Sequence, residues 1–517
     1  MTPFHPPHLI TSAAQVRAWD AATVEAEGIT SYELMQRAAA AFVRAFRADF
    51  PVEDYPNVVV VCGPGNNGGD GACAASLLDR RGYHVQTYGY WADRERRSAD
   101  LQLAWRHLEH VALDCTHEND QLPPEVIAGA DVVIDALFGV GLSRPAEGVY
   151  AELVTRLSAA RALASVDVPS GQAIDGAHPA WPAVRATRTY TFGALKYAAL
   201  LSDTGPAWGA VRVLDIGLAP AEDVGIADDP RVATADTLGP FLRPRRRFTH
   251  KGSHGHVLVL AGSRGHGGAA LLSATGAYRA GAGLVTAYVP AALEQTLQSG
   301  LPEAMTLVDP EADFLTAVPD LGRYDAFVVG PGLGTREATG AFLRELLAAV
   351  GERPIVIDAD ALNLLATGPA GLAAKLPHNA VLTPHPGEFA RLIGRRTEGA
   401  ERVAALRQYG EEELRGGAVV VLKDQCTAVA DATGRLSFNY YAGNPGMGTG
   451  GTGDVLSGVI AAQLAAGRAP WDAARVGVYL HARAGDLAAA VVGERALLAG
   501  DVAAYLGRVS PPMASRR

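Results

Sequence analysis

The apolar positions in the first half of the chain fall into short continuous runs separated by helical stretches. Val58–Cys62 is a run of four valines and a cysteine, as in a strand that is buried on both faces. Glycine-rich residues follow it, and then the helical segment Ala72–Arg81. Strands that alternate with helices indicate a parallel sheet with right-handed crossovers. The stretch Ala13–Arg47 is predicted to be helical and to pack on this sheet. The other predicted strands are His84–Tyr88, Asp131–Asp135, Ala162–Asp167, Thr187–Phe192 and Val211–Asp215.

The pattern weakens over Gly217–Asp236, a stretch rich in proline, alanine and aspartate, and it restarts near Pro240. Helices are predicted between the strands of the second half, which are Val257–Ala261, Leu284–Val289, Asp325–Val329, Ile355–Asp358, Ala380–Thr383 and Val419–Lys423. The fold class is therefore α/β with two domains. We expect one domain over residues 1–228, a second over 229–510, and a frayed tail over 511–517.

The composition supports a globular protein and argues against several classes of function. Of the 517 residues, 48% are apolar and 19% are charged, which is enough for a large core. The net charge of −10 argues against a general nucleic-acid or anionic-membrane surface. Val455–Gly467 is among the longest uncharged apolar runs and is too short to span a membrane. The four cysteines lack metal-ligand spacing and fit a reducing compartment, so we expect a cytoplasmic protein without nucleic-acid or membrane partners.

The glycine-rich segment Gly63–Gly71 follows the strand Val58–Cys62. A strand, a glycine loop and a helix N-terminus form a cradle for anions, because the free N–H groups point outward and the helix dipole favours negative charge. The spacing differs from the dinucleotide-binding fingerprint, so a plain Rossmann assignment would be weak. The alternative is a tight turn, but a turn alone does not need the polar groups of Asn66, Asn67 and Asp70.

Two further polar segments are predicted at the same edge of the first sheet. Asp135–Pro145 and Asp167–Gly171 each begin where a strand ends, and ligands bind at the carboxyl ends of strands in open α/β folds. Asn67, Asp135 and Ser170 offer hard oxygen atoms, which suit an alkali or alkaline-earth cation better than zinc. Taken one at a time, each of these residues fits better as part of a turn or a helix cap.

The segment Asn444–Asp454 is the most specific motif of the chain. It places five glycines ahead of the apolar helix predicted over Val455–Ala466. The helix N-terminus offers N–H donors to an anion, and Asp454 lies beside them in the first turn. A carboxylate in this position could accept the proton of a substrate hydroxyl as that hydroxyl attacks a phosphoryl group. The alternative is that Asp454 only complements the helix dipole.

Other polar groups follow strands of the second half. Lys423 could pair with a phosphate or lie on the surface without a role. The two prolines of Thr383–Glu388 stiffen the turn that presents His385 and Glu388. Gly330–Gly334 is another glycine loop at a strand end.

Two groups of residues could suggest metal binding in the second half. Asp358 and Asp360 stand at a strand end and could hold Mg²⁺ through water, or could equally cap a helix. His250, His254 and His256 lie close together in sequence, but no thiolate or carboxylate cluster accompanies them. We therefore predict an ordered basic turn there instead of a zinc site.

Together these motifs resemble the bifunctional NAD(P)H-hydrate repair enzymes of bacteria, over nearly the whole chain. Asn66–Gly71, Gly139–Pro145 and Asp167–Ser170 resemble the N-terminal epimerase of that family, which implies a Rossmann-like three-layer sandwich. The implied K⁺ ligands are Asn67, Asp135 and Ser170. The implied contacts with the hydrate are Asn66, Asn67, Gly68, Gly69, Asp70, Gly139, Val140, Gly141, Leu142, Ser143, Arg144, Pro145, Tyr150 and Asp167. Asp167 is the candidate acid/base residue for epimerisation.

The second half resembles the ADP/ATP-dependent dehydratase of the same family, which has a ribokinase-like α/β fold. The resemblance lies in His250–His256, Thr383–Glu388 and Gly450–Leu456. It implies Mg²⁺ with ADP or ATP as the cofactor. The implied contacts with the hydrate are Ala269, Gly334, His385 and Asp454. The implied contacts with the nucleotide are Lys423, Asp424, Gln425, Cys426, Thr427 and Gly453.

One residue departs from the family pattern. The nucleotide loop usually has glycine after its lysine, whereas this chain has Asp424 after Lys423. A carboxylate near phosphates or adenosine is expected to weaken nucleotide binding or to change nucleotide choice. The glycine-threonine loop is intact, so activity is still expected.

The resemblance implies a metabolite-repair enzyme that acts on NADHX and NADPHX and is a homo-oligomer. The first domain would epimerise the C6 hydroxyl from R to S, and the second would dehydrate the S epimer through a phosphorylated intermediate, with Asp454 as the base. A second hypothesis is a kinase that releases a stable phosphorylated metabolite. A third is a nucleotide sensor or scaffold with inactive sites, which the presence of Asp454 and Asp167 argues against.

Overall fold

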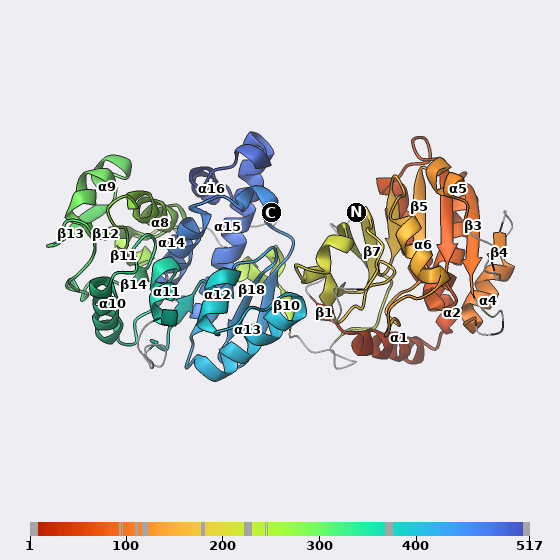
Figure 1. Ribbon diagram of the computed structural model, residues 1–517, viewed down its shortest axis with the longest axis horizontal. Helices are drawn as coiled ribbons and strands as arrows, with labels where there is room; N and C mark the ends of the chain where they lie inside the picture. Colours follow the sequence, from red (N-terminus) through yellow and green to blue (C-terminus); the bar gives the residue numbers. More distant parts are fainter. Residues whose placement is uncertain are drawn as a thin grey trace. The chain divides into compact units, whose positions relative to one another are not determined.

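The computed structural model describes residues 9–91, 95, 97–108, 112–115, 122–176, 181–221, 230–242, 245, 247–367 and 376–509. The chain divides into two compact units, Met1–Asp229 and Pro230–Arg517 (Figure 1). The expected domain boundary between residues 228 and 229 and the expected tail over 511–517 lie outside the described residues.

The first unit is built on a parallel sheet whose described strands have the order β4-β3-β2-β5-β6-β7-β9. The strands are β2 (Asn57–Cys62), β3 (His84–Tyr90), β4 (Ala112–Cys115), β5 (Val132–Ala136), β6 (Leu163–Val166), β7 (Arg188–Phe192) and β9 (Ala210–Leu214). Successive residues of β2 enter different cores, with Val58 and Val60 on one face and Val59 and Val61 on the other. The continuous apolar run therefore corresponds to a strand that is covered on both faces.

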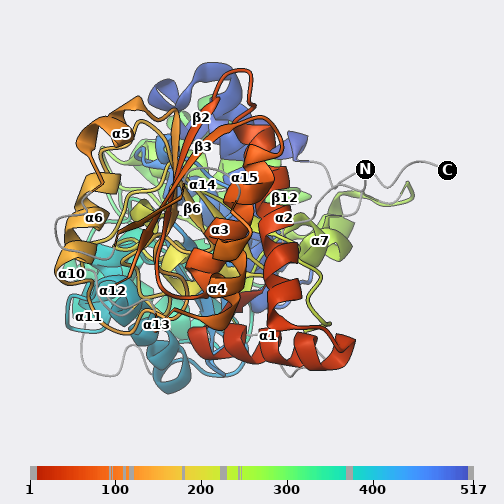
Figure 2. The same cartoon turned by 90° about the vertical axis from the view of Figure 1, so that its right-hand side faces the viewer.

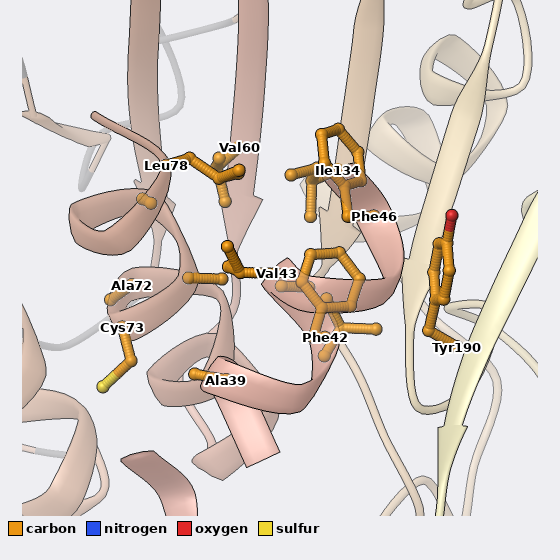
Figure 3. Packing of buried hydrophobic residues seen from close by; sticks show 14 of the residues in the cluster. Ala39, Phe42, Val43, Phe46, Val60, Ala72, Cys73, Leu78, Ile134 and Tyr190 are labelled. Carbon is orange, nitrogen blue, oxygen red and sulfur yellow. The ribbon is translucent and has the colours of Figure 1, made fainter. Parts of the chain in front are cut away.

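Helices cover both faces of this sheet (Figure 2). On one side lie α2 (Ser31–Asp49), α3 (Asn66–Asp79) and α4 (Ala99–Arg106), and on the other α5 (Pro124–Gly129) and α6 (Val149–Leu157). Phe42 and Phe46 of α2 pack on the sheet, and the Phe42 ring meets Tyr190 of β7 edge-on at 5.1 Å between centroids (Figure 3). The predicted three-layer α/β arrangement of the first unit is confirmed.

The helical stretch predicted over Ala13–Arg47 is two helices. The first, α1 (Ala13–Glu27), begins with a capping box at Ser12 and ends at Gly28, whose φ of 64° lies in the left-handed region that glycine adopts most easily. Thr30 then caps α2. Ahead of α1, β1 (Ile10–Thr11) pairs in parallel with β8 (Leu195–Lys196). The short 3₁₀ helices of this unit are Tyr197–Leu200 and Gly205–Ala207.

The helix predicted to start at Ala72 starts at Asn66 instead. Most of the glycine segment is therefore the first turns of α3, and not a loop. The glycines allow this helix to approach its neighbours closely. A Cβ on Gly68 would lie 1.9 Å from the carbonyl oxygen of Gly63, and a Cβ on Gly71 would lie 2.4 Å from the Cβ of Ala136.

The second unit contains a larger sheet whose described strands have the order β10-β19-β18-β17-β16-β15-β14-β11-β12-β13. All neighbouring pairs are parallel except β17–β18 and β18–β19. The strands are β10 (Arg231–Val232), β11 (His256–Leu260), β12 (Leu284–Pro290), β13 (Met305–Asp309), β14 (Ala326–Val329), β15 (Ile355–Ile357), β16 (Ala380–Leu382), β17 (Val419–Leu422), β18 (Thr427–Asp431) and β19 (Leu436–Asn439).

Helices also cover both faces of the second sheet. One face packs against α8 (Gly267–Arg279), α9 (Glu294–Gly300), α14 (Thr452–Ala465) and α15 (Pro470–Val492), and α16 (Ala499–Tyr505) packs beyond them. Figure 1 shows α10 (Glu337–Val350), α11 (Ala359–Thr367), α12 (Pro386–Leu392) and α13 (Gly399–Glu413) on the other side. The remaining helical segments among the described residues are α7 (Ala235–Leu238) and the 3₁₀ helices Gly239–Phe241, Lys251–His254, Ala291–Leu293, Pro445–Met447, Glu494–Ala496 and Leu506–Arg508.

Two glycines fix the position of α14, the helix that follows the glycine-threonine segment. A Cβ on Gly458 would lie 1.9 Å from the carbonyl oxygen of Ser273 in α8, and a Cβ on Gly276 would lie 2.4 Å from the carbonyl oxygen of Val455. The backbones of α8 and α14 therefore touch, and the N-terminus of α14 is held rigidly. Within the described part of the chain, no helix is both long and apolar enough to cross a membrane.

Candidate functional site

The first candidate site lies where the strand order of the first sheet reverses, between β2 and β5. Ligands of open α/β sheets bind at this position. A cavity of about 670 Å³ is present there. The predicted hydrate contacts that line it are Asn66, Asn67, Asp70, Gly139, Val140, Gly141, Leu142, Ser143, Arg144 and Asp167. The structure thus brings ten separately predicted residues to one cavity, and their role as ligand contacts stays a prediction.

The other four predicted hydrate contacts do not line this cavity. Gly68 and Gly69 are buried in α3, where a Cβ on Gly69 would lie 2.5 Å from the Met35 side chain. The Tyr150 hydroxyl donates to the backbone oxygen of Tyr90 at 3.2 Å, and Pro145 lies just beyond the lining segment. The two glycines therefore have a packing role that their sequence motif alone does not reveal.

The predicted cation ligands lie around the segment that follows β5. Asp135 is fully buried and accepts hydrogen bonds from the Ser165 hydroxyl at 2.9 Å and from the Ser170 hydroxyl at 2.5 Å. Its pKa is raised by burial, although these hydrogen bonds oppose the shift. Asn67 reaches the same segment from α3, since a Cβ on Gly139 would lie 3.1 Å from its Oδ1. The Asn67 amide nitrogen is buried and finds no hydrogen-bond partner among the described residues.

Asp167 stands at the end of β6 in a strained backbone conformation. Its φ is 60°, in the left-handed region that few non-glycine residues occupy. The carboxylate oxygen Oδ1 accepts hydrogen bonds from Thr191 Oγ1 and from the backbone N–H of Phe192, both at 3.0 Å. The same oxygen lies 3.3 Å from Nζ of the fully buried Lys196. A fixed carboxylate with its charge balanced by a lysine therefore faces the cavity, and backbone strain of this kind concentrates at functional sites.

Sequence reasoning missed two charged residues of this site. Lys196 follows a strand that has no polar motif, and its Nζ also donates to the carbonyl oxygens of Phe192 and Ala194. Asp20 lines the cavity from α1. A signal for Asp20 exists in the sequence, because it is a carboxylate four residues after Val16 and four before Val24, on an otherwise apolar helix face.

The second candidate site is the N-terminus of α14. Gly451 precedes the helix with a φ of 93°, and Asp454 lies in its first turn, as predicted. Gly451 to Asp454 are partly accessible, so the free N–H groups of the first turn remain open to a ligand. Burial, assisted by the charge of Asp358, raises the pKa of Asp454 to about 7.

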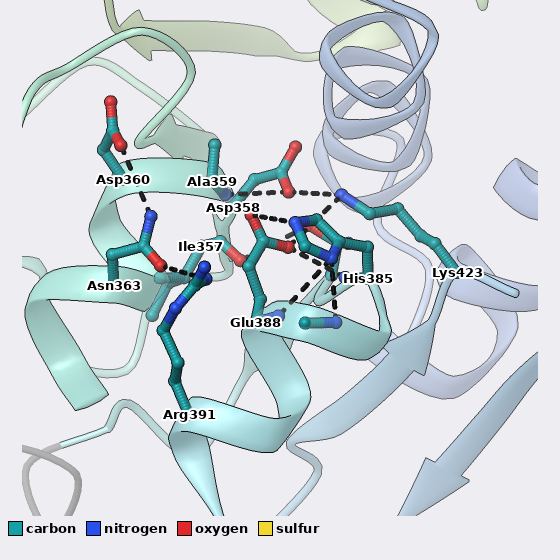
Figure 4. A network of polar contacts seen from close by, with 11 residues as sticks. Ile357, Asp358, Ala359, Asp360, Asn363, His385, Glu388, Arg391 and Lys423 are labelled. Carbon is teal, nitrogen blue, oxygen red and sulfur yellow. Dashed lines mark hydrogen bonds and ion pairs between the residues drawn. The ribbon is translucent and has the colours of Figure 1, made fainter. Parts of the chain in front are cut away.

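Lys423 is the centre of a buried charge network beside this turn (Figure 4). Its Nζ donates to Asp358 Oδ1 at 2.7 Å and lies 4.0 Å from Glu388 Oε2. Burial alone would lower the pKa of Lys423, but the facing carboxylates, first Asp358, raise it overall. A Cβ on Gly453 would lie 3.3 Å from Nζ, so the lysine also borders the glycine-threonine turn. Lys423 is therefore a largely buried, ion-paired lysine and not a surface lysine, and its pairing with a phosphate stays a prediction.

His385 caps the N-terminus of α12. Its Nδ1 accepts from the backbone N–H groups of Gly387 at 3.0 Å and Glu388 at 3.4 Å, and the Glu388 carboxylate accepts from the backbone N–H of His385 at 2.8 Å. This reciprocal capping fixes the imidazole with its side chain about half exposed. Figure 4 shows His385 and Glu388 next to Asp358 and Lys423.

The two remaining predicted hydrate contacts lie at the reversal point of the second sheet, between β11 and β14. The backbone N–H of Gly334 donates to Asp360 Oδ2 at 2.8 Å. A Cβ on Gly332 would lie 3.0 Å from the Cβ of Ala269, so the loop after β14 touches the start of α8. The loop that carries Gly334 and the helix that carries Ala269 are thus neighbours, and Asp360 also accepts from the Asn363 amide at 3.4 Å.

The predicted nucleotide loop is the turn between β17 and β18. Asp424 forms an ion pair with Arg402 of α13, and its other oxygen accepts from the backbone N–H of Gln425 at 2.9 Å. Burial raises the pKa of the Cys426 thiol to about 12, so this cysteine is a neutral side chain. The structure brings Lys423 and Gly453 together, and the described contacts of Asp424 link it to α13.

The histidines near residue 250 bond to different partners instead of to a common point. The His256 ring bonds to the Thr286 hydroxyl at 2.8 Å, and the His254 ring bonds to the Thr249 hydroxyl at 3.1 Å. Within the part of the chain that the structure describes, no group of three or more histidine, cysteine or acidic residues is arranged to hold a metal ion.

Fold and sites together define a two-domain α/β protein with a cavity in one unit and, in the other, an accessible helix N-terminus preceded by a glycine-threonine turn. Two family models match the chain. Residues 31–198 match the YjeF-related protein N-terminus, and residues 257–508 match NAD(P)H-hydrate dehydratase. The second match agrees with the ribokinase-like fold expected for the second unit.

Curated relatives match almost the whole chain. The bifunctional NAD(P)H-hydrate repair enzyme Nnr of Coxiella burnetii is 36% identical over 502 residues, which cover 95% of this chain and 97% of that protein. The Escherichia coli enzyme of the same name is 34% identical, with 98% and 95% covered. A structure of the ADP/ATP-dependent NAD(P)H-hydrate dehydratase of Bacillus subtilis with ATP and Mg²⁺ is 29% identical, covers 55% of this chain and 98% of that chain, and has a TM-score of 0.48. The chain belongs to the family of bifunctional NAD(P)H-hydrate repair enzymes.

Proposed function

We propose that this chain returns hydrated nicotinamide coenzymes to their reduced form by two activities on one polypeptide. The first unit interconverts the R and S epimers at C6 of NADHX or NADPHX. The second unit dehydrates the S epimer at the expense of ADP or ATP. The observation that carries the proposal is the N-terminus of α14, where Asp454, partly accessible glycine backbone and Lys423 lie close together.

The dehydration needs a better leaving group than hydroxide. Asp454, whose pKa is raised to about 7 by burial, accepts the proton of the C6 hydroxyl as its oxygen attacks the terminal phosphoryl group. The N–H groups of the first turn of α14 and the Lys423 ammonium stabilise the phosphoryl charge. The ring nitrogen lone pair then expels phosphate from C6, and loss of a proton from C5 restores the dihydropyridine ring.

The carboxylates beside this turn fit Mg²⁺. Asp358 and Asp360 are hard oxygen donors at the end of β15, and they would hold the ion. When bound, Mg²⁺ neutralises the charge of the nucleotide phosphates. The nucleotide would lie along Lys423 to Thr427 and Gly453, and the hydrate against Ala269, Gly334, His385 and Asp454.

In the first unit, Asp167 is the proposed acid/base residue, since it faces the cavity from a rigid setting. The oxygen atoms of Asn67, Asp135 and Ser170 fit K⁺, which requires several hard oxygen ligands and no thiolate or imidazole. The unpaired amide nitrogen of Asn67 is a donor, so it supports a bound acceptor such as the hydrate at this position, and Oδ1 is the atom that would hold K⁺. When bound, K⁺ would order the segment after β5 that carries Gly139 to Arg144.

The cell compartment and the assembly remain proposals. All four cysteines are free, which supports a reducing cytoplasm. We expect a homo-oligomer, which light scattering of the purified chain measures directly.

The test uses separated epimers of the hydrate. The chain is incubated with the S epimer, nucleotide and Mg²⁺, and recovery of reduced-nicotinamide absorbance is followed together with phosphate release. We expect one phosphate for each coenzyme recovered. The R epimer should be recovered at a rate that depends on K⁺. A stable phosphorylated product without recovered coenzyme would instead identify a metabolite kinase.

A further inference from the structure

The helix α1 carries a carboxylate on the face that packs inward. Asp20 shares this face with Trp19 and Thr23, which are both buried, and with Val16 and Val24, which line the cavity. The described structure gives the Asp20 side chain no hydrogen bond, and the nearby groups act on it only through burial and charge. A carboxylate on an inward helix face is uncommon without a partner, so its position indicates a role in ligand chemistry.

The position of α1 is fixed by contacts with the segment that follows β9. The Trp19 ring N–H donates to the Ala219 carbonyl at 2.7 Å, and the Ala219 N–H donates to the Thr23 hydroxyl at 3.0 Å. Immediately before α1, Thr11 of β1 pairs with Lys196 of β8. The residue that balances the charge of Asp167 is thus tied to the strand that leads into α1. This helix precedes the segment 31–198 that the N-terminal family model matches.

We propose that Asp20 is the second catalytic residue of epimerisation, acting from α1 while Asp167 acts from the end of β6. Both residues line the same cavity, and they come from different elements. The charged groups that face Asp20 are Asp167, Asp70 and Lys196, and Arg17 lines the same cavity. The inference rests on the proposed epimerase function of this cavity.

The reaction requires one proton shared by the two carboxyl groups. Protonated Asp20 gives its proton to the C6 hydroxyl, the C–O bond breaks, and water leaves with the bonding pair. The lone pair of the ring nitrogen forms the C6–N1 double bond of an iminium ion. Water then adds to the other face of C6, the π pair returns to nitrogen, and Asp167 takes the proton of the incoming water. The reverse reaction uses the same steps with the two roles exchanged, so no redox partner is needed.

The electrostatics of the cavity agree with these roles. Burial, and next the charge of Asp167, raise the pKa of Asp20 to about 6. Lys196 balances the negative charge of Asp167 at 3.3 Å. The raised pKa of Asp20 suits a group that donates a proton, and the pairing of Asp167 with Lys196 suits a fixed carboxylate. Asp70 also has a pKa raised well above its usual value, first by burial and then by Asp167, so it must be compared with Asp20 directly.

The test is Asp20→Asn in the full-length chain, with the rate of epimer interconversion measured with K⁺ and without nucleotide. We expect the turnover number to fall roughly 100-fold or more with little change in KM, since a positioned proton donor contributes about 10²–10⁴-fold. The matched control is Glu25→Gln, the same change on the exposed face of the same helix, which should leave the rate unchanged. Dehydration of the S epimer by the same preparations should stay at the wild-type rate.

The pH dependence and isotope exchange keep the proposal testable if Asp20→Asn folds poorly. In the wild-type chain the interconversion rate should fall as the pH rises above about 6, because Asp20 then loses its proton. In water labelled with ¹⁸O, each inversion should place one solvent oxygen at C6.

A normal turnover number in Asp20→Asn, or an equal fall in turnover number in Glu25→Gln, would overturn the role of Asp20. So would a pH profile in which Asp70→Asn, and not Asp20→Asn, abolishes the fall in rate above about pH 6. Inversion at C6 without incorporation of ¹⁸O would also overturn it. If the wild-type chain does not interconvert the epimers at all, the proposed function of the first unit fails instead.

Discussion

The two candidate sites differ in which aspartate the buried lysine pairs with. The pairing explains why one proposed catalytic aspartate is held as a fixed carboxylate and the other has a raised pKa. In the first unit, Lys196 pairs with Asp167 itself. In the second unit, Lys423 pairs with Asp358, and Asp454 stands among carboxylates with no hydrogen bond to its side chain among the described residues. The first arrangement keeps a charged group in place. The second leaves Asp454 with a pKa near 7, where a general base is most effective.

The two sites share one feature of the backbone. Asp167 and Ala359 are the non-glycine residues with positive φ among those described, at 60° and 47°. Each lies at a strand end, and Ala359 directly follows Asp358, whose Oδ1 accepts its backbone N–H at 2.9 Å. In both units the chain therefore turns sharply where a strand ends, at or directly after the carboxylate that pairs with a lysine. Backbone strain therefore lies at the charge-pairing residue Asp167 in the first site and at Ala359, next to the charge-pairing Asp358, in the second. Asp454 is placed by a regular helix instead.

The largest effect is expected from Asp454→Asn. Loss of the base should lower the turnover number of dehydration roughly 10²–10⁴-fold, with the dissociation constant of the nucleotide nearly unchanged. Steady-state kinetics with the S epimer and calorimetric titration with ATP measure the two quantities. Epimer interconversion by the first unit is the internal control. A turnover number within threefold of wild type, as an order-of-magnitude limit, would remove Asp454 from the mechanism.

The next effect concerns stability. Lys423→Met leaves the fully buried Asp358 without its partner, and breaking a buried ion pair costs about 3–5 kcal/mol. We expect the second unit to unfold at lower denaturant concentration, while the first unit keeps its own transition. Adding Asp358→Asn to Lys423→Met should recover part of the loss. An unchanged transition in Lys423→Met would contradict the buried pair.

The pH profile of dehydration distinguishes the two aspartates. A base must be ionised to act, so the rate should rise with pH through about 7, the pKa of Asp454. Interconversion of epimers should instead decline above about 6 if Asp20 has its proposed role. Both profiles are measured on one preparation between pH 5 and 9 as an approximate range. If both rates rose with pH, or both fell, the comparison of the two sites would be contradicted.

The smallest effect is expected at the residue that departs from the family pattern. Asp424 is paired with Arg402, so its charge is largely balanced before a nucleotide binds. Asp424→Asn keeps the acceptor for the Gln425 N–H and frees the Arg402 cation, and KM for ATP should fall about two- to fivefold. Glu401→Gln, which alters an exposed ion pair on the same helix, is the control. A higher KM in Asp424→Asn would show that the carboxylate itself contacts the nucleotide.

The sequence predicts the buried strands that are continuous apolar runs, because such a run is stable only when both faces of its strand are covered. The buried strands β18 and β19 are not predicted, since polar residues interrupt their apolar positions. The edge strands β4 and β13 escape this prediction, since their half-exposed residues lack a continuous apolar run. The predicted start of α3 is wrong because glycine usually disfavours helices, whereas here tight packing against Gly63 and Ala136 requires it. Lys196 could not be assigned from sequence, because its partner Asp167 comes from a distant segment. Asp20 does leave a signal, since it lies four residues from Val16 and four from Val24 on an apolar helix face.

The central claim is that one chain holds two separate active sites whose aspartates do not substitute for each other. The most direct measurement is coenzyme recovery from an equal mixture of the two hydrate epimers. It is made with the Asp167→Asn protein alone, with the Asp454→Asn protein alone, and with the two variant proteins mixed in one reaction. We predict recovery of the S half alone with Asp167→Asn, no recovery with Asp454→Asn, and full recovery with the mixture of variants. Full recovery by Asp167→Asn alone at the wild-type rate, or any rapid recovery by Asp454→Asn alone, would contradict the account.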